Sequence, residues 1–395
     1  MESQLRIWLS SVKNIGVKIN KKTMEYIREF ENVSAYEAEK DTLGKPNVAW
    51  CVEENEVKYE KYNPHLPNNV IQYTATSKLD EAHSLTESGF KTYAFSGDNG
   101  QLSMEEHTFS DGVGLITFSN DIVSIGIGAF SNCSGLTSIN MPNLLENIGN
   151  GAFNTCTNLT SITFGDSVAM IGDAAFGGCG LISIDIQDSV TSIGQSAFLN
   201  CTSLKSAIIG NGLIEIKASL FNGCNSLETV TIGNSVENIN QAAFYGCANL
   251  SSITFGNALT TIGENAFKQC SSLASVELPN SVTTIGNNSF YSCSGLTSIE
   301  FGNSLTTIGQ AAFNGCINLT HVVIPSSITT FQSAAFLGCN SLLSITINAV
   351  TPPTVQGGEF VNTNNCPIYV PSQSVDTYKT ANGWTTYASR IQAIQ

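Results

Sequence analysis

A single pattern of apolar and polar residues recurs about every 23 residues between Leu115 and Ile347. Each unit reads L-x-S-I-x-[IFLM]-x-x-S-[VL]-x-x-I-G-x-x-A-F-x-x-C-x-x, numbered here from position 1 at its leucine. Positions 4 and 6 are apolar and positions 3 and 5 mostly polar, which predicts a strand with one buried face. The β-branched residues before the glycine predict a second extended stretch. Glycine at position 14 predicts a left-handed backbone that ends it. Full units begin at Leu136, Leu159, Leu181, Leu204, Leu227, Leu250, Leu273, Leu296 and Leu319.

No single unit can bury its apolar face alone, so the units are expected to stack. Successive strands then pair in parallel, about 4.8 Å apart, and ten units extend over roughly 48 Å. The predicted fold is therefore a repeat solenoid, mainly β, with leucine-rich repeats over residues 111–347. A shortened unit precedes the series at Leu115, and a degenerate one follows from Leu342.

Cysteine closes each unit at position 21. This strict spacing indicates one structural slot filled once per repeat, rather than a disulfide framework. The sequence predicts a buried column of reduced thiols that pack as small hydrophobic side chains. The chain contains no C-x-x-C motif, so it carries no zinc signature. The periodic cysteines are Cys133, Cys156, Cys179, Cys201, Cys224, Cys247, Cys270, Cys293, Cys316 and Cys339.

The two ends of the chain depart from the repeat. Residues 1–46 contain apolar stripes at helical spacing and residues 47–110 look β-rich, so together they predict a small α/β N-terminal module. That module is either ordinary domain core or a device for attachment and homo-oligomerisation. Residues 348–395 predict a C-terminal cap, in which Tyr378, Trp384 and Tyr387 close the open core.

Composition narrows the possible partners. The 395 residues carry a formal net charge of −15. Such a chain repels phosphate backbones and anionic lipid surfaces, so neither nucleic acid nor a membrane surface is an expected partner. No apolar run approaches the roughly 18 residues of a membrane span, so membrane insertion is not expected. The first residues, MESQLRIWLSSVKNIG, lack the apolar core of a signal peptide.

The stretches LTSITFGDSV and SVTSIGQSAF, with the C-x-x-L-x-x-I junction between units, resemble the BspA-like, treponemal-type leucine-rich repeats. The resemblance covers Leu115 to about Ile347. It implies a surface or adhesion protein that binds other proteins or host matrix and has no enzyme activity. Asparagine stands at position 8 in several units, where the standard leucine-rich pattern has it at position 9.

Few residues suggest chemistry. None of the four histidines stands at metal-ligand spacing, and the chain has no dinucleotide fingerprint or P-loop, so no metal or cofactor is expected. Glu277 and Glu300 occupy position 5 of consecutive units, which places them roughly 5 Å apart, and His321 is at position 3 of the next unit. Three interpretations remain for this group: a solvated acidic spot, a contact for a cation or basic partner, or the carboxylate pair of a retaining glycosidase.

Specificity is expected where the outward positions 2, 3 and 5 depart from serine and threonine. Exposed aromatic residues after the core phenylalanines are the other candidates, because aromatic anchors dominate protein interfaces. The predicted partner-binding residues are Asp185, Lys205, Glu228, Glu277, Glu300, His321, Tyr245 and Tyr291.

The leading hypothesis is a non-enzymatic binding or adhesion protein that presents its repeat surface to a protein or glycan receptor at a bacterial cell surface. One alternative is a bacteriophage tail-fibre or receptor-binding virion component, which would assemble without a signal peptide. The other alternative is a glycosidase-like enzyme.

Overall fold

The computed structural model describes residues 50–53, 56–59, 68–76, 95–97 and 104–395. The chain divides into two compact units, Met1–Pro67 and Asn68–Gln395. In the first unit, strands β1 (Trp50–Glu53) and β2 (Glu56–Tyr59) pair as an antiparallel hairpin. The predicted helices of residues 1–46 lie outside the described residues. The boundaries of the four predicted domains, and a role for the N-terminal module in oligomerisation, stay predictions.

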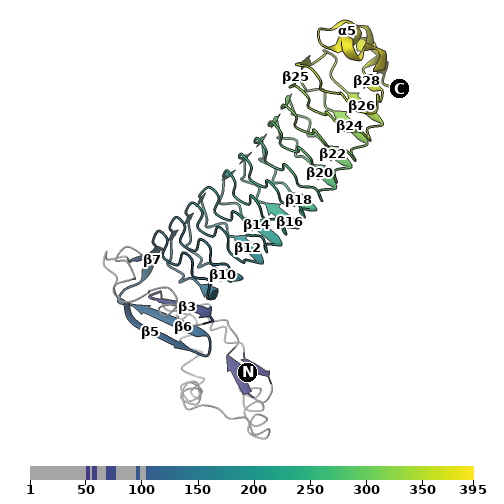
Figure 1. The fold of residues 1–395 in the computed structure, drawn as a ribbon. Helices are drawn as coiled ribbons and strands as arrows, with labels where there is room; N and C mark the ends of the chain where they lie inside the picture. The colour runs from purple at the N-terminus through teal and green to yellow at the C-terminus, as the bar shows by residue number, and fades with distance from the viewer. Residues whose placement is uncertain (1–49, 54–55, 60–67, 77–94, 98–103) are drawn as a thin grey trace, which may run out of the picture. The chain divides into compact units, whose positions relative to one another are not determined.

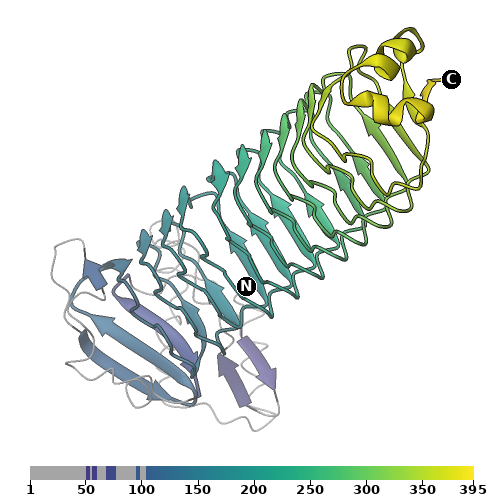
Figure 2. The same cartoon turned by 45° about the horizontal axis from the view of Figure 1, so that its top comes forward.

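The second compact unit, Asn68–Gln395, contains a β-solenoid in which every repeat contributes two strands, as Figures 1 and 2 show. Strands of the first line begin within the first three positions of each repeat and pair in parallel with register partners one repeat apart, in three sheets that are interrupted between the strands beginning at Ser161 and Ser183 and between those beginning at Ser252 and Ser275. They are β8 (Leu136–Asn140), β10 (Ser161–Thr163), β12 (Ser183–Ile186), β14 (Ser206–Ile209), β16 (Thr229–Ile232), β18 (Ser252–Thr254), β20 (Ser275–Glu277), β22 (Ser298–Glu300), β24 (His321–Ile324) and β26 (Ser344–Ile347).

Strands of the second line are short and cover positions 12 and 13 in the full repeats, where the β-branched stretch was predicted. They also pair in parallel from turn to turn, in two sheets that are interrupted between the strands beginning at Ser192 and Glu215. They are β7 (Ile122–Ile125), β9 (Asn147–Ile148), β11 (Met170–Ile171), β13 (Ser192–Ile193), β15 (Glu215–Ile216), β17 (Asn238–Ile239), β19 (Thr261–Ile262), β21 (Thr284–Ile285), β23 (Thr307–Ile308), β25 (Thr330–Phe331) and β27 (Thr354–Val355). The predicted solenoid with a parallel sheet is confirmed.

Antiparallel strands cover the first turns of the solenoid. Strand β3 (Val70–Ala75) lies between β8 and β6 (Val113–Phe118), and β5 (Met104–Ser110) pairs with the far side of β6. Strand β4 (Phe95–Gly97) pairs with β7. These strands occupy edges that would otherwise offer unpaired backbone groups to another chain.

The last turn is covered by β28 (Ile368–Val370), the 3₁₀ helix η1 (Ser372–Ser374), helix α5 (Val375–Thr380), the 3₁₀ helix η2 (Trp384–Arg390) and β29 (Ile391–Ala393). Two fully buried aromatic residues fix this cap to the solenoid. Trp384 Nε1 donates to the Pro353 carbonyl oxygen, and the Tyr378 hydroxyl donates to that of Ala349, both at 2.8 Å. The predicted C-terminal cap is confirmed.

The core is organised in columns. From Phe130 to Phe336 the phenylalanines at position 18 stack with ring centroids 5.0 to 5.5 Å apart. The periodic cysteines form a second column, in which every thiol is buried and free of disulfide bonds. Both columns agree with the sequence prediction.

The expectation for position 14 was wrong. Gly263, like other glycines at this position, does not have a positive φ, and the left-handed residue lies two positions later, at Asn265 with φ 55°. Glycine is needed because of crowding. A Cβ on Gly263 would lie 2.7 Å from the Ile239 carbonyl oxygen and 2.9 Å from the Asn240 carbonyl carbon of the preceding turn. The close approach of two backbones explains the residue.

An asparagine ladder forms at position 8. The backbone N–H of Asn234 donates to Asn211 Oδ1 at 2.8 Å, and that of Asn303 donates to Asn280 Oδ1 at 3.0 Å. A similar ladder runs along position 15, where the N–H of Gln310 donates to Asn287 Oδ1 at 2.9 Å. Side-chain oxygens thus satisfy backbone donors in the turns between strands.

Candidate binding surfaces

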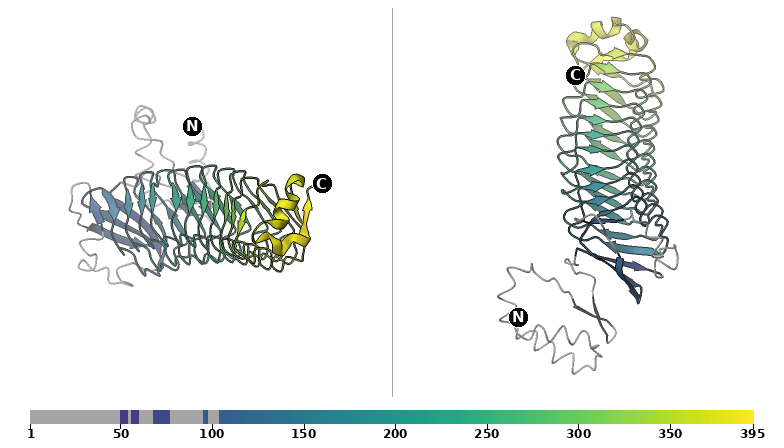
Figure 3. Two further views of the ribbon diagram at one scale, coloured as in Figure 1. Left: turned by 90° about the horizontal axis from the view of Figure 1, so that it is seen from above. Right: turned by 90° about the vertical axis from the view of Figure 1, so that its left-hand side faces the viewer.

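The strands of the first line follow one another along the solenoid (Figure 3). Their outward side chains therefore belong to one surface that crosses many repeats. Along β20 and β22 these side chains alternate exposed, buried, exposed, as the two-residue period requires. A partner lying on this surface can contact several turns at once, because neighbours on it come from different repeats.

Glu277 and Glu300 are direct register partners on adjacent parallel strands, and both side chains are exposed. Within the described part of the chain, neither carboxylate forms a hydrogen bond or an ion pair. The predicted pairing of the two carboxylates is therefore present, and it leaves adjacent like charges uncompensated by the protein.

His321 is less closely tied to this pair than the sequence suggested. Its Cα pairs with that of Ser298, but its imidazole Nδ1 lies 2.8 Å from Ser344 Oγ on the next strand. Among the residues described, His321 forms no ion pair with Glu300. The side chain is oriented by β26, on the opposite side from the two glutamates.

The remaining charged candidates lie in earlier turns of the solenoid than Glu277 and Glu300. Glu228 and Lys205 occupy position 2 of adjacent turns, where the backbone N–H of Glu228 donates to the Lys205 carbonyl oxygen at 2.8 Å. Asp185, at position 5, pairs by Cα with Ile208. Over the described residues these three side chains form no ion pair with one another. Residues 111–347 contain thirteen acidic residues and three lysines, so this group lies on an acidic solenoid.

The two candidate tyrosines are linked through Lys268, which separates them in the position-19 column. Its Nζ lies 5.7 Å from the centroid of the Tyr245 ring and 5.0 Å from that of the Tyr291 ring. A cation between two aromatic faces is attracted to both. Both tyrosines are half-buried rather than fully exposed, and the sequence analysis did not anticipate the role of the lysine.

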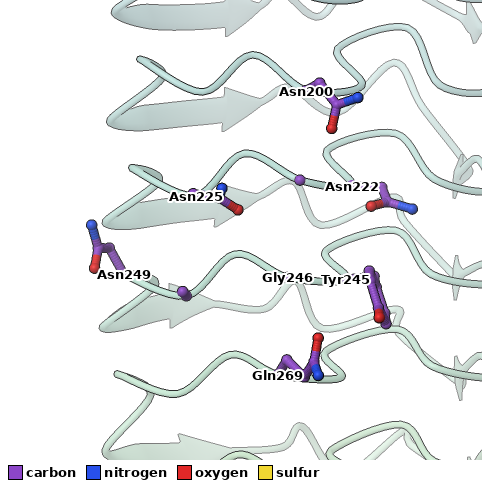
Figure 4. A pocket seen from close by; sticks show the side chains of 9 residues that line it. Asn200, Asn222, Asn225, Tyr245, Gly246, Asn249 and Gln269 are labelled. Atoms are coloured by element: carbon purple, nitrogen blue, oxygen red, sulfur yellow. The ribbon is translucent and has the colours of Figure 1, made fainter.

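A shallow hollow of about 570 Å³, which the repeat pattern did not indicate, lies beside Tyr245 (Figure 4). It crosses four consecutive turns, and none of its lining residues is charged. We call it the amide hollow, after its lining of Asn200, Asn222, Asn225, Asn249, Gln269, Tyr245, Gly223, Gly246 and Ala248. These residues occupy positions 19, 20, 22 and 23, where the repeat pattern specifies no residue, so only a run of amides at those positions could have signalled the site.

The described residues contain no group of three or more histidine, cysteine, aspartate or glutamate side chains able to hold a metal ion. The Glu277–Glu300 pair also lies on an exposed strand surface, whereas small-molecule sites are usually concave and enclose their ligand.

In the described parts of the chain, no helix has both the length and the apolar character needed to cross a membrane.

A family model described as the BspA-type leucine-rich repeat region matches residues 123–251 and 237–367, and it contains six copies of the repeat. The chain belongs to this BspA-type leucine-rich repeat family. The match spans the solenoid turns that carry every candidate residue named above.

Solved structures of bacterial leucine-rich repeat proteins resemble this chain. A leucine-rich repeat protein from Bacteroides ovatus is 24% identical, covering 73% of this chain and 90% of its own, with a TM-score of 0.38. A leucine rich cell surface protein from Faecalibacterium prausnitzii is 27% identical, covering 73% and 89%, with a TM-score of 0.35. The T. pallidum leucine-rich repeat protein is 21% identical, covering 60% and 87%, with a TM-score of 0.39. No curated protein matches the chain.

Proposed function

We propose that this BspA-type protein is a non-enzymatic adhesion protein that presents its solenoid to a partner at a bacterial cell surface. Family membership supports a repeat protein without catalytic machinery. The name of the F. prausnitzii structure, a cell surface protein, supports the location. This partner is a protein that binds, through a basic segment, the surface formed by the outward side chains of the first strand line. We call that surface the sheet surface.

The observation that carries this proposal is the register pairing of Glu277 with Glu300 on an exposed strand surface. Neighbouring carboxylates repel each other, and no basic side chain of the described protein compensates them. Lysine or arginine residues of a partner would remove that repulsion and gain charge-assisted hydrogen bonds. The serines around the pair at position 3 are small enough to let a partner backbone approach the strands.

The test is a panel of host matrix proteins together with a lysine-rich peptide, screened against the wild-type chain and a Glu277→Gln/Glu300→Gln variant. We expect the double variant to bind roughly tenfold more weakly, since each exposed charge contact contributes up to about 1 kcal/mol. The affinity of the wild type should fall with added salt, and that of the variant should depend less on salt.

The matched control is Glu237→Gln/Glu264→Gln. It removes the same total charge from two exposed residues at positions 11 and 15, away from the first strand line. If both variants lose affinity equally, the effect comes from net charge and the proposed sheet contact is wrong. Surface location is tested separately, by protease treatment of intact cells: a surface protein is cleaved while cytoplasmic proteins are not.

A further inference from the structure

We propose that the amide hollow is a second binding site and that its ligand is a neutral oligosaccharide. The inference rests on the proposed function only in treating the solenoid as a binding scaffold. It uses none of the residues of the Glu277–Glu300 surface, so the two proposals can fail independently.

The hollow has the shape of a short groove. Four consecutive residues at position 20 are Asn200, Gly223, Gly246 and Gln269. The Asn200 amide lies over Gly223, where an added Cβ would be 3.3 Å from Asn200 Cγ, so the open gap is at Gly246 and is about one turn long, roughly 5 Å at the spacing of paired strands. A Cβ placed on Gly246 would meet no atom within 4 Å, so the space above this glycine is open. Amide side chains close both ends, as Figure 4 shows for Asn200 and Gln269.

The amides that line the groove are not used by the fold. In the described chain, the side chains of Asn200, Asn222, Asn249 and Gln269 make no hydrogen bond to the protein. An amide offers two donors and one acceptor oxygen, and it therefore matches hydroxyl groups, which both donate and accept. A ligand rich in hydroxyl groups can satisfy all of them.

The hydrogen bonding of Asn249 differs from that of asparagines at the same position in other repeats. At the same position 23, Asn158 Nδ2 donates to the Ser134 carbonyl oxygen at 2.7 Å, and Asn318 Nδ2 donates to that of Ser294 at 2.8 Å. At Asn249 the backbone N–H takes the corresponding acceptor, the Asn225 carbonyl oxygen, at 3.2 Å. The side chain that binds the solenoid in the other two units is therefore available to a ligand here.

Tyr245 supplies the aromatic wall. The Lys268 ammonium group of the neighbouring turn lies against the Tyr245 ring, and it also lies against the Tyr291 ring. A fixed aromatic face packs against the apolar C–H groups of a sugar ring and keeps its hydroxyl available for a hydrogen bond. The lining carries no charge that would compensate an acidic sugar, and the solenoid around it is acidic, so the ligand is neutral.

The experiment uses the full chain on an array of neutral and acidic oligosaccharides, followed by calorimetric titration of the strongest neutral ligand. We expect Asn249→Ala and Tyr245→Ala each to weaken binding at least tenfold. The matched control changes the same residue type at the same repeat position outside the hollow: Asn318→Ala should stay within twofold of wild type. Circular dichroism verifies that each variant folds, and Asn249→Ala removes no side-chain hydrogen bond within the protein.

Three results would overturn the inference: no neutral oligosaccharide binds the wild type, only acidic ones bind, or binding survives in the Asn249→Ala/Tyr245→Ala double variant. None of these results tests binding to the Glu277–Glu300 surface, which is measured with basic probes. Conversely, the Glu277→Gln/Glu300→Gln variant should bind the neutral oligosaccharide as well as the wild type does.

Discussion

The thiol of Cys270 donates to the carbonyl oxygen of Phe244 in the preceding turn, with Sγ and O 3.3 Å apart. The same oxygen accepts the backbone N–H of Cys247 at 3.2 Å. Equivalent thiol contacts of 3.0 to 3.3 Å recur from Cys156 to Cys339. Cysteine thus fills a slot that needs a small apolar volume and a weak donor pointing at the neighbouring turn.

The first prediction concerns the oxidation state of these thiols. All ten periodic cysteines should titrate with a thiol reagent after denaturation, because each is buried and free of disulfide bonds, and the thiols from Cys156 to Cys339 donate to backbone carbonyls. In the native protein at neutral pH the same reagent should react with them slowly. Paired thiols, found by mass spectrometry without reduction, would contradict this.

The second prediction concerns alkaline pH. Burial raises the pKa of the Cys247 and Cys293 thiols from about 9 to about 12. Between these values the unfolded chain releases protons that the native chain keeps, so the contribution of these thiols to the free energy of unfolding should be constant below pH 9 and fall as pH rises toward 12. Each such thiol contributes up to about 1.4 kcal/mol per pH unit. Urea denaturation at several pH values measures the slope, which Cys247→Ala/Cys293→Ala should reduce.

The third prediction concerns the phenylalanine column. The ring of Phe267 is fully buried and stacks on Phe244 and Phe290, with centroids 5.1 and 5.2 Å away. Phe267→Ala should lower the free energy of unfolding by about 3–5 kcal/mol, through lost burial and the cavity left behind. The exposed Val323→Ala is the control and should change it by less than about 0.5 kcal/mol. A loss below about 1 kcal/mol at Phe267 would contradict the stacked core.

The fourth prediction has the opposite sign. Ser289 occupies position 17, where most units have alanine, and its buried hydroxyl has no hydrogen-bond partner. Ser289→Ala should raise the free energy of unfolding by about 1 kcal/mol, since it removes an unsatisfied polar group without leaving a large cavity. The exposed Ser275→Ala should have little effect. A destabilised Ser289→Ala protein would show that the hydroxyl has a partner after all.

The sequence predicted the fold closely because the repeat encodes it redundantly. The alternation around Val276, the phenylalanine column and the cysteine column each recur in nearly every unit, so one pattern constrains ten turns. Gly263 was explained wrongly because a close approach between backbones of successive turns depends on how tightly the turns stack. A single unit read in isolation predicts a conformation but not a contact with its neighbour.

The candidate sites were predicted unevenly for a related reason. Register alone brought Glu277 beside Glu300, since parallel strands of equal length place equal positions together. The orientation of His321 depends on a hydrogen bond to Ser344, and the amide hollow depends on two glycines and several amides from different turns. Such groupings arise from variable positions in the repeat, which carry no signal until the turns are stacked.

The constant rise from turn to turn also has an evolutionary consequence. Removing residues 250–272 would delete one whole unit and leave every core column in register, because each column continues at the same position of the next unit. Unequal recombination between the gene segments that encode these units could therefore shorten or lengthen the protein in steps of one repeat. A whole unit added between Gln269 of the amide hollow and Glu277 of the acidic pair would move the two sites apart by one strand spacing, about 4.8 Å.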